Sequence, residues 1–468
     1  MTDLLYRPLT EITELLRRRE LSPVELMEAT LARIDATQEK LNAFTAMRDR
    51  DAVLADARAA EERIARGDVR PLEGVPLGVK DLENAAGLVT SMGSVPYKDN
   101  LADEDSVQVA RLREAGAIVV GKTNAPEFGY TAITKNLLFG ESRNPWNTER
   151  TPGGSSGGSS AAIAGGVVTL ATASDGGGSV RLPASFTGCF GLKPSFGRIP
   201  NEGKDLWVMD DTAGQGPLTR TVEDAALHLD VTVGAHPLDP NSLPHPGLSY
   251  RDVLRDLPKG LRIGYSPDLG YARVQSDVAE IAYDAARVFD ELGHDFQELA
   301  GGPPLMATEW GIVGSFELLG KLGHLLPERE GDFGRNFIQG VKTGVKMTPE
   351  RWFEIRRKRE ELNRWCADTF ERFDLLLTPT IPYDAPPARG PFPSEVEGRK
   401  QPPAGVASFT IPFNLSWHPA ATVRAGLSKA GLPVGLQIVG PRHRDDLVLQ
   451  AAHAFEQARP WAHEWPSV

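Results

Sequence analysis

Two glycine- and serine-rich stretches, TPGGSSGGSSAA (residues 151–162) and SDGGGSVRLP (residues 174–183), lie close together in the middle of the sequence. Stretches of this kind serve as flexible linkers, as phosphate-binding loops or as catalytic loops. The context disfavours a linker, because SAAIAGGVVTLATAS (residues 160–174) has small residues typical of a tightly packed helix, followed by a β-branched strand. A phosphate-binding loop is disfavoured because neither stretch contains a Lys-Ser or Lys-Thr pair or a GxGxxG pattern.

The catalytic interpretation rests on three glycines that directly precede a serine. Glycine lets a backbone turn tightly enough to direct several N–H groups at one point, and an oxyanion hole needs that arrangement. Gly176, Gly177, Gly178 and Ser179 are therefore the candidate N–H donors, with Ser179 also the candidate nucleophile.

A nucleophilic serine needs a base, and no histidine lies in a neighbouring motif. Lys80 is the candidate because it follows the apolar stretch GVPLGV (residues 74–79), where burial would lower the pKa of its amine. The same position suits a structural ion pair with a carboxylate such as that of Asp81. The spacing of the residues does not distinguish these two roles.

Composition limits the partners and the compartment. The net charge of −12 argues against nucleic acid as the main partner, since duplex binding needs a basic face. No apolar run is long enough to span a bilayer, and charges interrupt the N-terminal apolar residues, unlike in a signal peptide. Two distant cysteines and nine histidines without an HExxH pairing indicate neither a disulfide framework nor a zinc site. We therefore expect a cytoplasmic protein without nucleic acid, membrane, metal or other cofactor.

Helical and strand patterns alternate along the chain, which predicts an α/β fold with helices covering a central sheet. Ser22 and Glu25 form a capping box at the start of an N-terminal helix, and Gly67 is the expected C-cap of the next one. Amphipathic, charge-rich stretches predict a helical insertion. We interpret the chain as a single domain (residues 1–468) with N-terminal helices (1–68), a catalytic core (69–230), the insertion (304–372) and the C-terminal part of the sheet (373–468).

The chain resembles the amidase signature family of serine hydrolases over nearly its whole length. The resemblance is carried by a specific combination of motifs: GVPLGVKD (74–81), GKTNAPEFG (121–129), NPWN (144–147), GGSSGGSSAAIAGG (153–166), SDGGGSVRLPASFTGCFGLKPSFGRIP (174–200), GPLTRTVEDAA (216–226), DLLLTPT (374–380) and GLPVGLQIVG (431–440). It implies the amidase signature fold, a central mixed β-sheet covered on both faces by helices with an inserted helical part.

The resemblance also implies a Ser-cisSer-Lys triad. Lys80 matches the lysine, Ser155 the middle serine and Ser179 the nucleophile, with a cis peptide bond between Gly154 and Ser155. In such a triad the lysine draws a proton through the middle serine from the nucleophile, and the oxyanion hole holds the tetrahedral intermediate. No metal or organic cofactor takes part.

Supporting residues follow from the same motifs. The resemblance puts Gly129 and Tyr130, with Ser155, at the substrate, although ordinary loop packing explains the first two equally well. Ser156 is expected to add a supporting hydrogen bond, and Asp175 and Arg181 to pair and hold the nucleophile loop. Cys189 is expected to pack as a small apolar residue. A stretch without a matching family pattern (201–213) carries candidate specificity residues: Trp207, Met209, Asp210 and Asp211.

The leading functional hypothesis is a stand-alone amidase, a monomer or homodimer, that acts on small aryl or apolar amides through an acyl-enzyme, with carbamates and esters as side reactions. The alternative within the family is the catalytic A subunit of a tRNA-dependent amidotransferase. Those subunits usually carry an acidic residue where this chain has Pro126. A non-enzymatic binding protein on the same fold is a third alternative, which would not need Lys80, Ser155 and Ser179 together.

Overall fold

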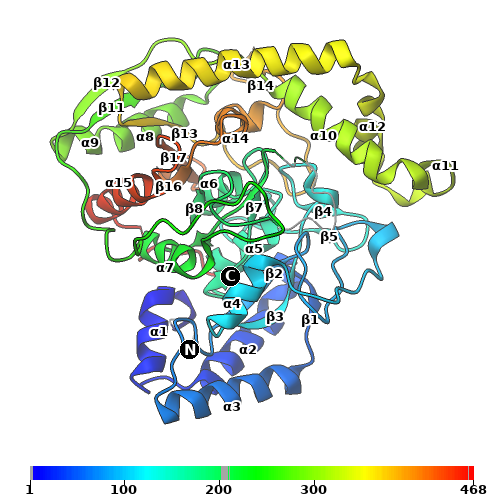
Figure 1. The fold of residues 1–468 in the computed structure, drawn as a ribbon, viewed down its shortest axis with the longest axis vertical. Helices are drawn as coiled ribbons and strands as arrows, with labels where there is room; N and C mark the ends of the chain where they lie inside the picture. Colours follow the sequence, from blue (N-terminus) through cyan, green and yellow to red (C-terminus); the bar gives the residue numbers. More distant parts are fainter. Residues whose placement is uncertain (1–3, 202–208, 210, 462) are drawn as a thin grey trace.

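The computed structural model describes residues 4–201, 209, 211–461 and 463–468, and one large mixed sheet organises it (Figure 1). Its eleven strands lie in the order β1 (Phe44–Met47), β3 (Ile118–Thr123), β2 (Pro76–Lys80), β6 (Leu170–Ala171), β10 (Leu218–Thr219), β8 (Phe190–Lys193), β16 (Ala420–Leu427), β17 (Pro433–Val439), β13 (Leu375–Pro379), β11 (Arg262–Tyr265) and β12 (Asp295–Glu298). Strand β2 runs parallel to both of its neighbours, whereas β16 runs antiparallel to both of its own.

Helices cover both faces of this sheet, and β13 shows how the sequence achieves it. Leu375 and Leu377 point to one face, where they pack with residues of α7 (Val222–Thr232), α9 (Val288–Glu291) and α15 (Asp445–Ala458). Leu376 points to the other face and packs with Phe413 of α14 (Ile411–Leu415). A run of apolar residues is therefore required here, because successive side chains face two separate cores. The predicted α/β fold with a mixed, doubly covered sheet is confirmed.

The N-terminal helices lie at one end of the molecule, at the bottom of Figure 1. They are α1 (Leu9–Arg17), α2 (Pro23–Leu41) and α3 (Arg50–Arg66). The capping box predicted at Ser22 is present, since its side chain accepts from the Glu25 N–H and the Glu25 carboxylate accepts from the Ser22 N–H. Gly67 ends α3 at a φ of 83°, a left-handed conformation that favours glycine.

The segment predicted as a helical insertion is helical and lies at the opposite end, at the top of Figure 1. It contains α10 (Ala307–Leu322), α11 (Leu326–Arg329), α12 (Arg335–Lys342) and α13 (Pro349–Arg372). Leu318, Leu322 and Phe337 of this segment pack around Phe128. The insertion therefore sits directly over the loop that follows β3.

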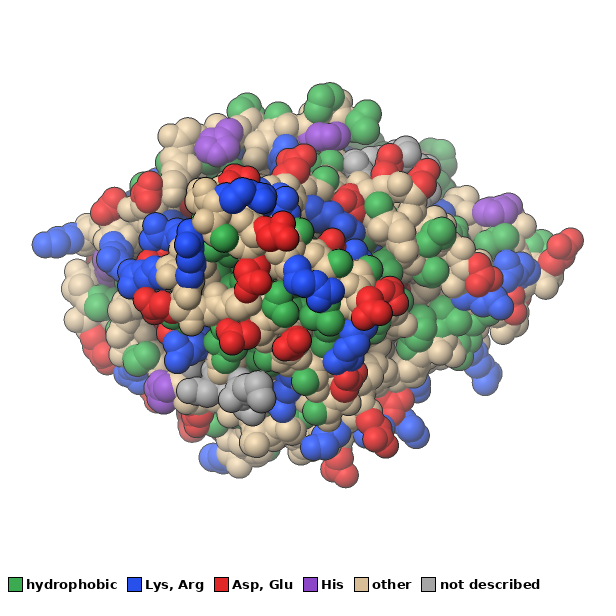
Figure 2. All heavy atoms as spheres, turned by 90° about the horizontal axis from the view of Figure 1, so that it is seen from below, with side chains coloured by type: hydrophobic (Ala, Val, Ile, Leu, Met, Phe, Trp, Pro, Cys, Tyr) green, Lys and Arg blue, Asp and Glu red, His purple; other side chains and the backbone are tan. Residues whose placement is uncertain are grey.

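Figure 2 shows the molecule from below relative to Figure 1, and acidic and basic side chains are interspersed over the face that it displays. Among the described residues, we find no helix with both the length and the apolar character needed to cross a membrane.

The core around β17 generates a stability prediction. Ile438 is fully buried and packs with Leu377, so Ile438→Ala should lower the free energy of unfolding by about 2–5 kcal/mol through lost burial and a residual cavity. Val345→Ala, at a side chain that is 73% exposed, should change it by less than about 0.5 kcal/mol. Chemical denaturation of both variants measures this difference, and equal effects would contradict the packing described.

Candidate active site

Lys80 ends strand β2, and its side chain enters a polar pocket with no exposure to solvent. Its backbone N–H donates to Thr172 Oγ1 at 2.9 Å, which fixes the end of the strand. Its Nζ donates to Ser155 Oγ at 2.8 Å, to Ser174 Oγ at 2.9 Å and to the Ser174 carbonyl at 3.3 Å. The amine is therefore held by three oxygen atoms, all of them uncharged.

An ion pair between Lys80 and Asp81, the structural alternative to catalysis, is not among the contacts of the described residues. The Asp81 carboxylate instead accepts hydrogen bonds from the backbone N–H and the hydroxyl of Ser91. Burial lowers the pKa of Lys80 from 10.5 to about 7, although the carboxylates of Asp175 and Glu83 act in the opposite direction. A substantial fraction of Lys80 is therefore neutral near pH 7 and able to accept a proton.

Ser155 lies in the glycine-rich loop that leads into α5 (Gly157–Ala164). The peptide bond between Gly154 and Ser155 is cis, the geometry that the family resemblance implies. Glycine is required in this loop for close packing: a Cβ on Gly158 would lie 2.2 Å from the backbone nitrogen of Asn124. The loop is thus pressed against the end of β3, and its composition reflects this contact and not flexibility.

Ser174 is a site residue that we did not predict. It supplies two of the three oxygens around the Lys80 amine, and its own N–H donates to Ser156 Oγ at 3.4 Å. Ser156 therefore makes a supporting hydrogen bond to Ser174, and Ser174 in turn binds the Lys80 amine. The available signal was the place of Ser174 directly before Asp175, at the start of the second glycine-rich stretch.

Ser179 lies between a short strand, β7 (Ser174–Asp175), and helix α6 (Arg181–Thr187). Asp175 and Arg181 pair as expected: Arg181 Nη2 lies 2.9 Å from Asp175 Oδ1, and both side chains are fully buried. Burial disfavours the carboxylate, but the Arg181 guanidinium outweighs this and holds the pKa of Asp175 below its ordinary value. The nucleophile loop is thus closed at its base by a buried, hydrogen-bonded ion pair.

The four predicted oxyanion donors are not equivalent. The backbone N–H groups of Gly176, Gly177 and Ser179 donate to no acceptor among the described residues. The Gly178 N–H donates to Asp175 Oδ1 at 2.7 Å and so differs from the other three predicted donors. The carboxylate that anchors the loop takes this N–H because the chain folds back over it within three residues. The N–H groups without an acceptor among the described residues are those of Gly176, Gly177 and Ser179.

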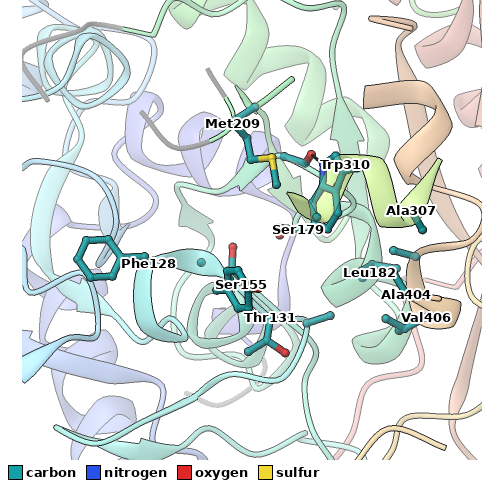
Figure 3. Close-up of a pocket in the computed structure, with 18 of the residues that line it drawn as sticks. Phe128, Thr131, Ser155, Ser179, Leu182, Met209, Ala307, Trp310, Ala404 and Val406 are labelled. Carbon is teal, nitrogen blue, oxygen red and sulfur yellow. Dashed lines mark hydrogen bonds between the residues drawn. The ribbon is translucent and has the colours of Figure 1, made fainter. Parts of the chain in front are cut away.

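A cavity of about 690 Å³ opens beside Ser155 and Ser179 (Figure 3). Gly129 and Tyr130, the residues predicted to lie at the substrate, line this cavity, and the Tyr130 hydroxyl lies 3.2 Å from Ser315 Oγ of the helical insertion. Figure 3 shows Phe128 on one side of the two serines and Ala307, Ala404 and Val406 on the other. The two serines thus face the middle of a predominantly apolar cavity, with room on both sides for the groups that flank a scissile bond.

The stretch without a family pattern contributes to the cavity through Met209. Asp211 does not line it; its carboxylate accepts from Arg359 of α13 and serves to attach this stretch to the insertion. Trp207 and Asp210 lie outside the described residues.

The remaining candidates concern cysteine and metal chemistry. Cys189 is fully buried in an apolar cluster, as expected of a packing residue. Within the described part of the chain, no three His, Cys, Asp or Glu side chains are grouped as metal ligands would be.

Comparison with known proteins gives the site its context. Residues 25–319 and 326–449 match the family model described as Amidase. An acylamidase of Rhodococcus erythropolis is 38% identical, with 98% of this chain and 96% of that protein covered. The A subunit of the glutamyl-tRNA(Gln) amidotransferase of Geobacter metallireducens is 34% identical, with 96% and 97% covered. The crystal structure of a bacterial aryl acylamidase of the amidase signature family superimposes with a TM-score of 0.91 at 31% identity, covering 98% of this chain and 97% of that one.

A family match over nearly the whole chain, on a fold of the same architecture, defines the class of protein. The chain belongs to the amidase signature family. It is accordingly an amidase, a hydrolase of carbon–nitrogen amide bonds.

The lowered pKa of Lys80 generates a pH prediction. If the neutral amine accepts the proton, kcat/KM for an uncharged amide should be constant at high pH and fall about tenfold per unit below about pH 7, as Lys80 becomes protonated. Initial rates across this range at fixed ionic strength measure the profile. Constant activity from about pH 8 down to about pH 6 would show that another group, or none, is the base.

Proposed function

We propose that this chain cleaves small aryl or apolar amides through an acyl-enzyme on Ser179, with Ser155 and Lys80 as its proton relay. The observation that carries the proposal is the hydrogen bond between the buried Lys80 amine and Ser155 Oγ, at the wall of the cavity that Ser179 also lines. A buried amine whose pKa is near 7 is matched to a proton transfer at neutral pH.

In the proposed acylation, Ser179 Oγ attacks the carbonyl carbon while its proton passes to Ser155 Oγ and the Ser155 proton passes to Lys80 Nζ. The negative charge that forms on the carbonyl oxygen is stabilised by the backbone N–H groups of Gly176, Gly177 and Ser179. The relay then runs in reverse and protonates the amine as the carbon–nitrogen bond breaks. Water repeats the two steps on the acyl-enzyme, releasing the acid and restoring the Ser179 hydroxyl.

Ser174 is proposed as a positioning residue in this relay. A neutral amine has two N–H donors and one lone pair. When Ser174 Oγ and the Ser174 carbonyl accept the two N–H groups, the lone pair is left facing Ser155 Oγ. This is the orientation in which Lys80 can take a proton from Ser155.

The lining of the cavity supports an apolar substrate. Among its described lining residues, Lys321 is the only charged one, and the larger part of the wall is formed by side chains such as Phe128, Leu182, Trp310 and Val406. A free amino acid such as glutamine carries an ammonium and a carboxylate, and its ammonium would need an acidic partner that these residues do not provide.

The second candidate function is that of the relative from Geobacter metallireducens, the A subunit of a glutamyl-tRNA(Gln) amidotransferase. Its support is an identity of 34% over 96% of this chain. It differs from the first candidate in the substrate and in the need for a partner, not in the proposed relay.

The relay generates a mutational prediction. Ser179→Ala should lower kcat by on the order of 10⁴-fold or more, and Ser155→Ala and Lys80→Ala by at least about 10³-fold, because each interrupts one chain of proton transfers. The double variants should be little worse than the single ones, since the residues act as a unit. Lys259→Ala, at an exposed lysine, is the control. Turnover by Ser179→Ala close to that of the unaltered enzyme would refute the nucleophile assignment.

The cavity generates a substrate prediction. The purified chain should hydrolyse anilides such as p-nitroacetanilide with a kcat/KM at least about 100-fold above that for glutamine, because only the anilide matches the apolar walls. A panel of aryl amides, aliphatic amides, carbamates, esters and glutamine measures this ranking. Efficient release of ammonia from glutamine, with no cleavage of any anilide or carbamate, would favour the amidotransferase function instead.

A further inference from the structure

In the nucleophile loop, the carbonyl groups of residues 175–178 all accept a hydrogen bond from a residue outside this segment. The Asp175 carbonyl accepts from Asn414 Nδ2 at 2.9 Å, and the Gly176 carbonyl from Trp310 Nε1 at 2.9 Å. The Gly177 carbonyl accepts from Thr410 Oγ1 at 2.6 Å, and the Gly178 carbonyl from the Leu182 N–H at 2.6 Å. These four bonds set the planes of four successive peptide groups.

The direction of each N–H follows from its carbonyl partner. In a trans peptide group the C=O of one residue and the N–H of the next point in opposite directions across the plane. The peptide between Gly176 and Gly177 is trans, so the bond from Trp310 to the Gly176 carbonyl turns the Gly177 N–H away from Trp310. Because both residues are glycines, no side chain restricts rotation of this peptide, and its orientation depends on hydrogen bonds.

The peptide between Gly176 and Gly177 is held at one end only. The next one, between Gly177 and Gly178, is fixed twice, since Thr410 binds its carbonyl and Asp175 binds its N–H. The Gly176 carbonyl has Trp310 as its donor, and the Gly177 N–H has no acceptor among the described residues. Trp310 is thus the residue on which the direction of the Gly177 N–H depends.

Trp310 also packs directly on this peptide. A Cβ on Gly177 would lie 2.4 Å from Cζ2 of the indole, so the ring occupies the space beside the glycine. Trp310 belongs to α10 of the helical insertion, and Figure 3 shows it beside Ser179. The other three donors come from elements outside the insertion: α14, the residue that precedes α14, and α6.

We propose that Trp310 is a positioning residue of the oxyanion hole: its indole N–H fixes the peptide between Gly176 and Gly177 so that the Gly177 N–H points at the developing oxyanion. The helical insertion thereby contributes to transition-state stabilisation as well as to the cavity wall. This inference rests on the proposed role of Ser179 as nucleophile.

The test removes the indole N–H and keeps an aromatic ring. Trp310→Phe should lower kcat for an anilide about tenfold and leave KM within about twofold, since the loose peptide weakens an interaction made mainly in the transition state. The affinity for an aryl trifluoromethyl ketone, which Ser179 converts into a tetrahedral adduct, should fall by the same factor as kcat/KM. Replacing Trp310 by β-(3-benzothienyl)alanine, which keeps the shape of the indole and lacks the N–H, should reproduce both losses.

Trp352→Phe is the matched control, because Trp352 is 44% exposed on α13, and its kinetic constants should not change. Unchanged kcat and ketone affinity in the benzothienyl variant would overturn the inference, and so would a loss confined to KM, which indicates a cavity-wall role alone. Ser179→Ala assayed in parallel separates the two proposals. An inactive Ser179→Ala beside an unimpaired benzothienyl variant refutes only the role of Trp310, whereas an active Ser179→Ala refutes the proposed nucleophile.

Discussion

The site depends on the burial of one amine without a carboxylate in contact. The three oxygens around Lys80 Nζ belong to Ser155 and Ser174 and carry no charge. Burial without a counter-ion favours the neutral amine, and this is the physical origin of a lysine with a pKa of about 7. Had Asp81 paired with Lys80, the amine would have stayed protonated; the hydrogen bonds from Ser91 keep that carboxylate occupied elsewhere.

A second constraint is the backbone conformation of the nucleophile loop, which is made largely of glycine. Glycines allow the backbone of residues 176–178 to approach other groups closely, but they leave its peptide planes unrestricted. The buried pair of Asp175 and Arg181 closes the base of the loop, and hydrogen bonds to its carbonyls set the planes. Its carbonyl groups all accept hydrogen bonds, whereas the N–H groups of Gly176, Gly177 and Ser179 have no acceptor among the described residues and can bind a ligand.

The helical insertion takes part in the same architecture. Trp310 of α10 donates a hydrogen bond to the nucleophile loop, and Ser315 of the same helix contacts Tyr130 in the cavity wall. Its α12 begins where the Gly334 N–H donates to the carboxylate of Glu127, the residue before Phe128. Substitutions in this segment can therefore change both the shape of the cavity and the orientation of the groups that surround the reacting carbonyl.

The sequence by itself determined the features that local patterns encode. These are the alternation of strands and helices, the capping box at Ser22, and the motifs that single out Lys80, Ser155 and Ser179. The tertiary structure alone decided which distant groups contact these motifs. Trp310 meets Gly176 across 134 positions and Thr410 meets Gly177 across 233. Periodicity and motif spacing report on neighbours along the chain, whereas these bonds exist only once distant elements have packed together. For the same reason the contact between Ser174 and Lys80, which are 94 positions apart, went unpredicted.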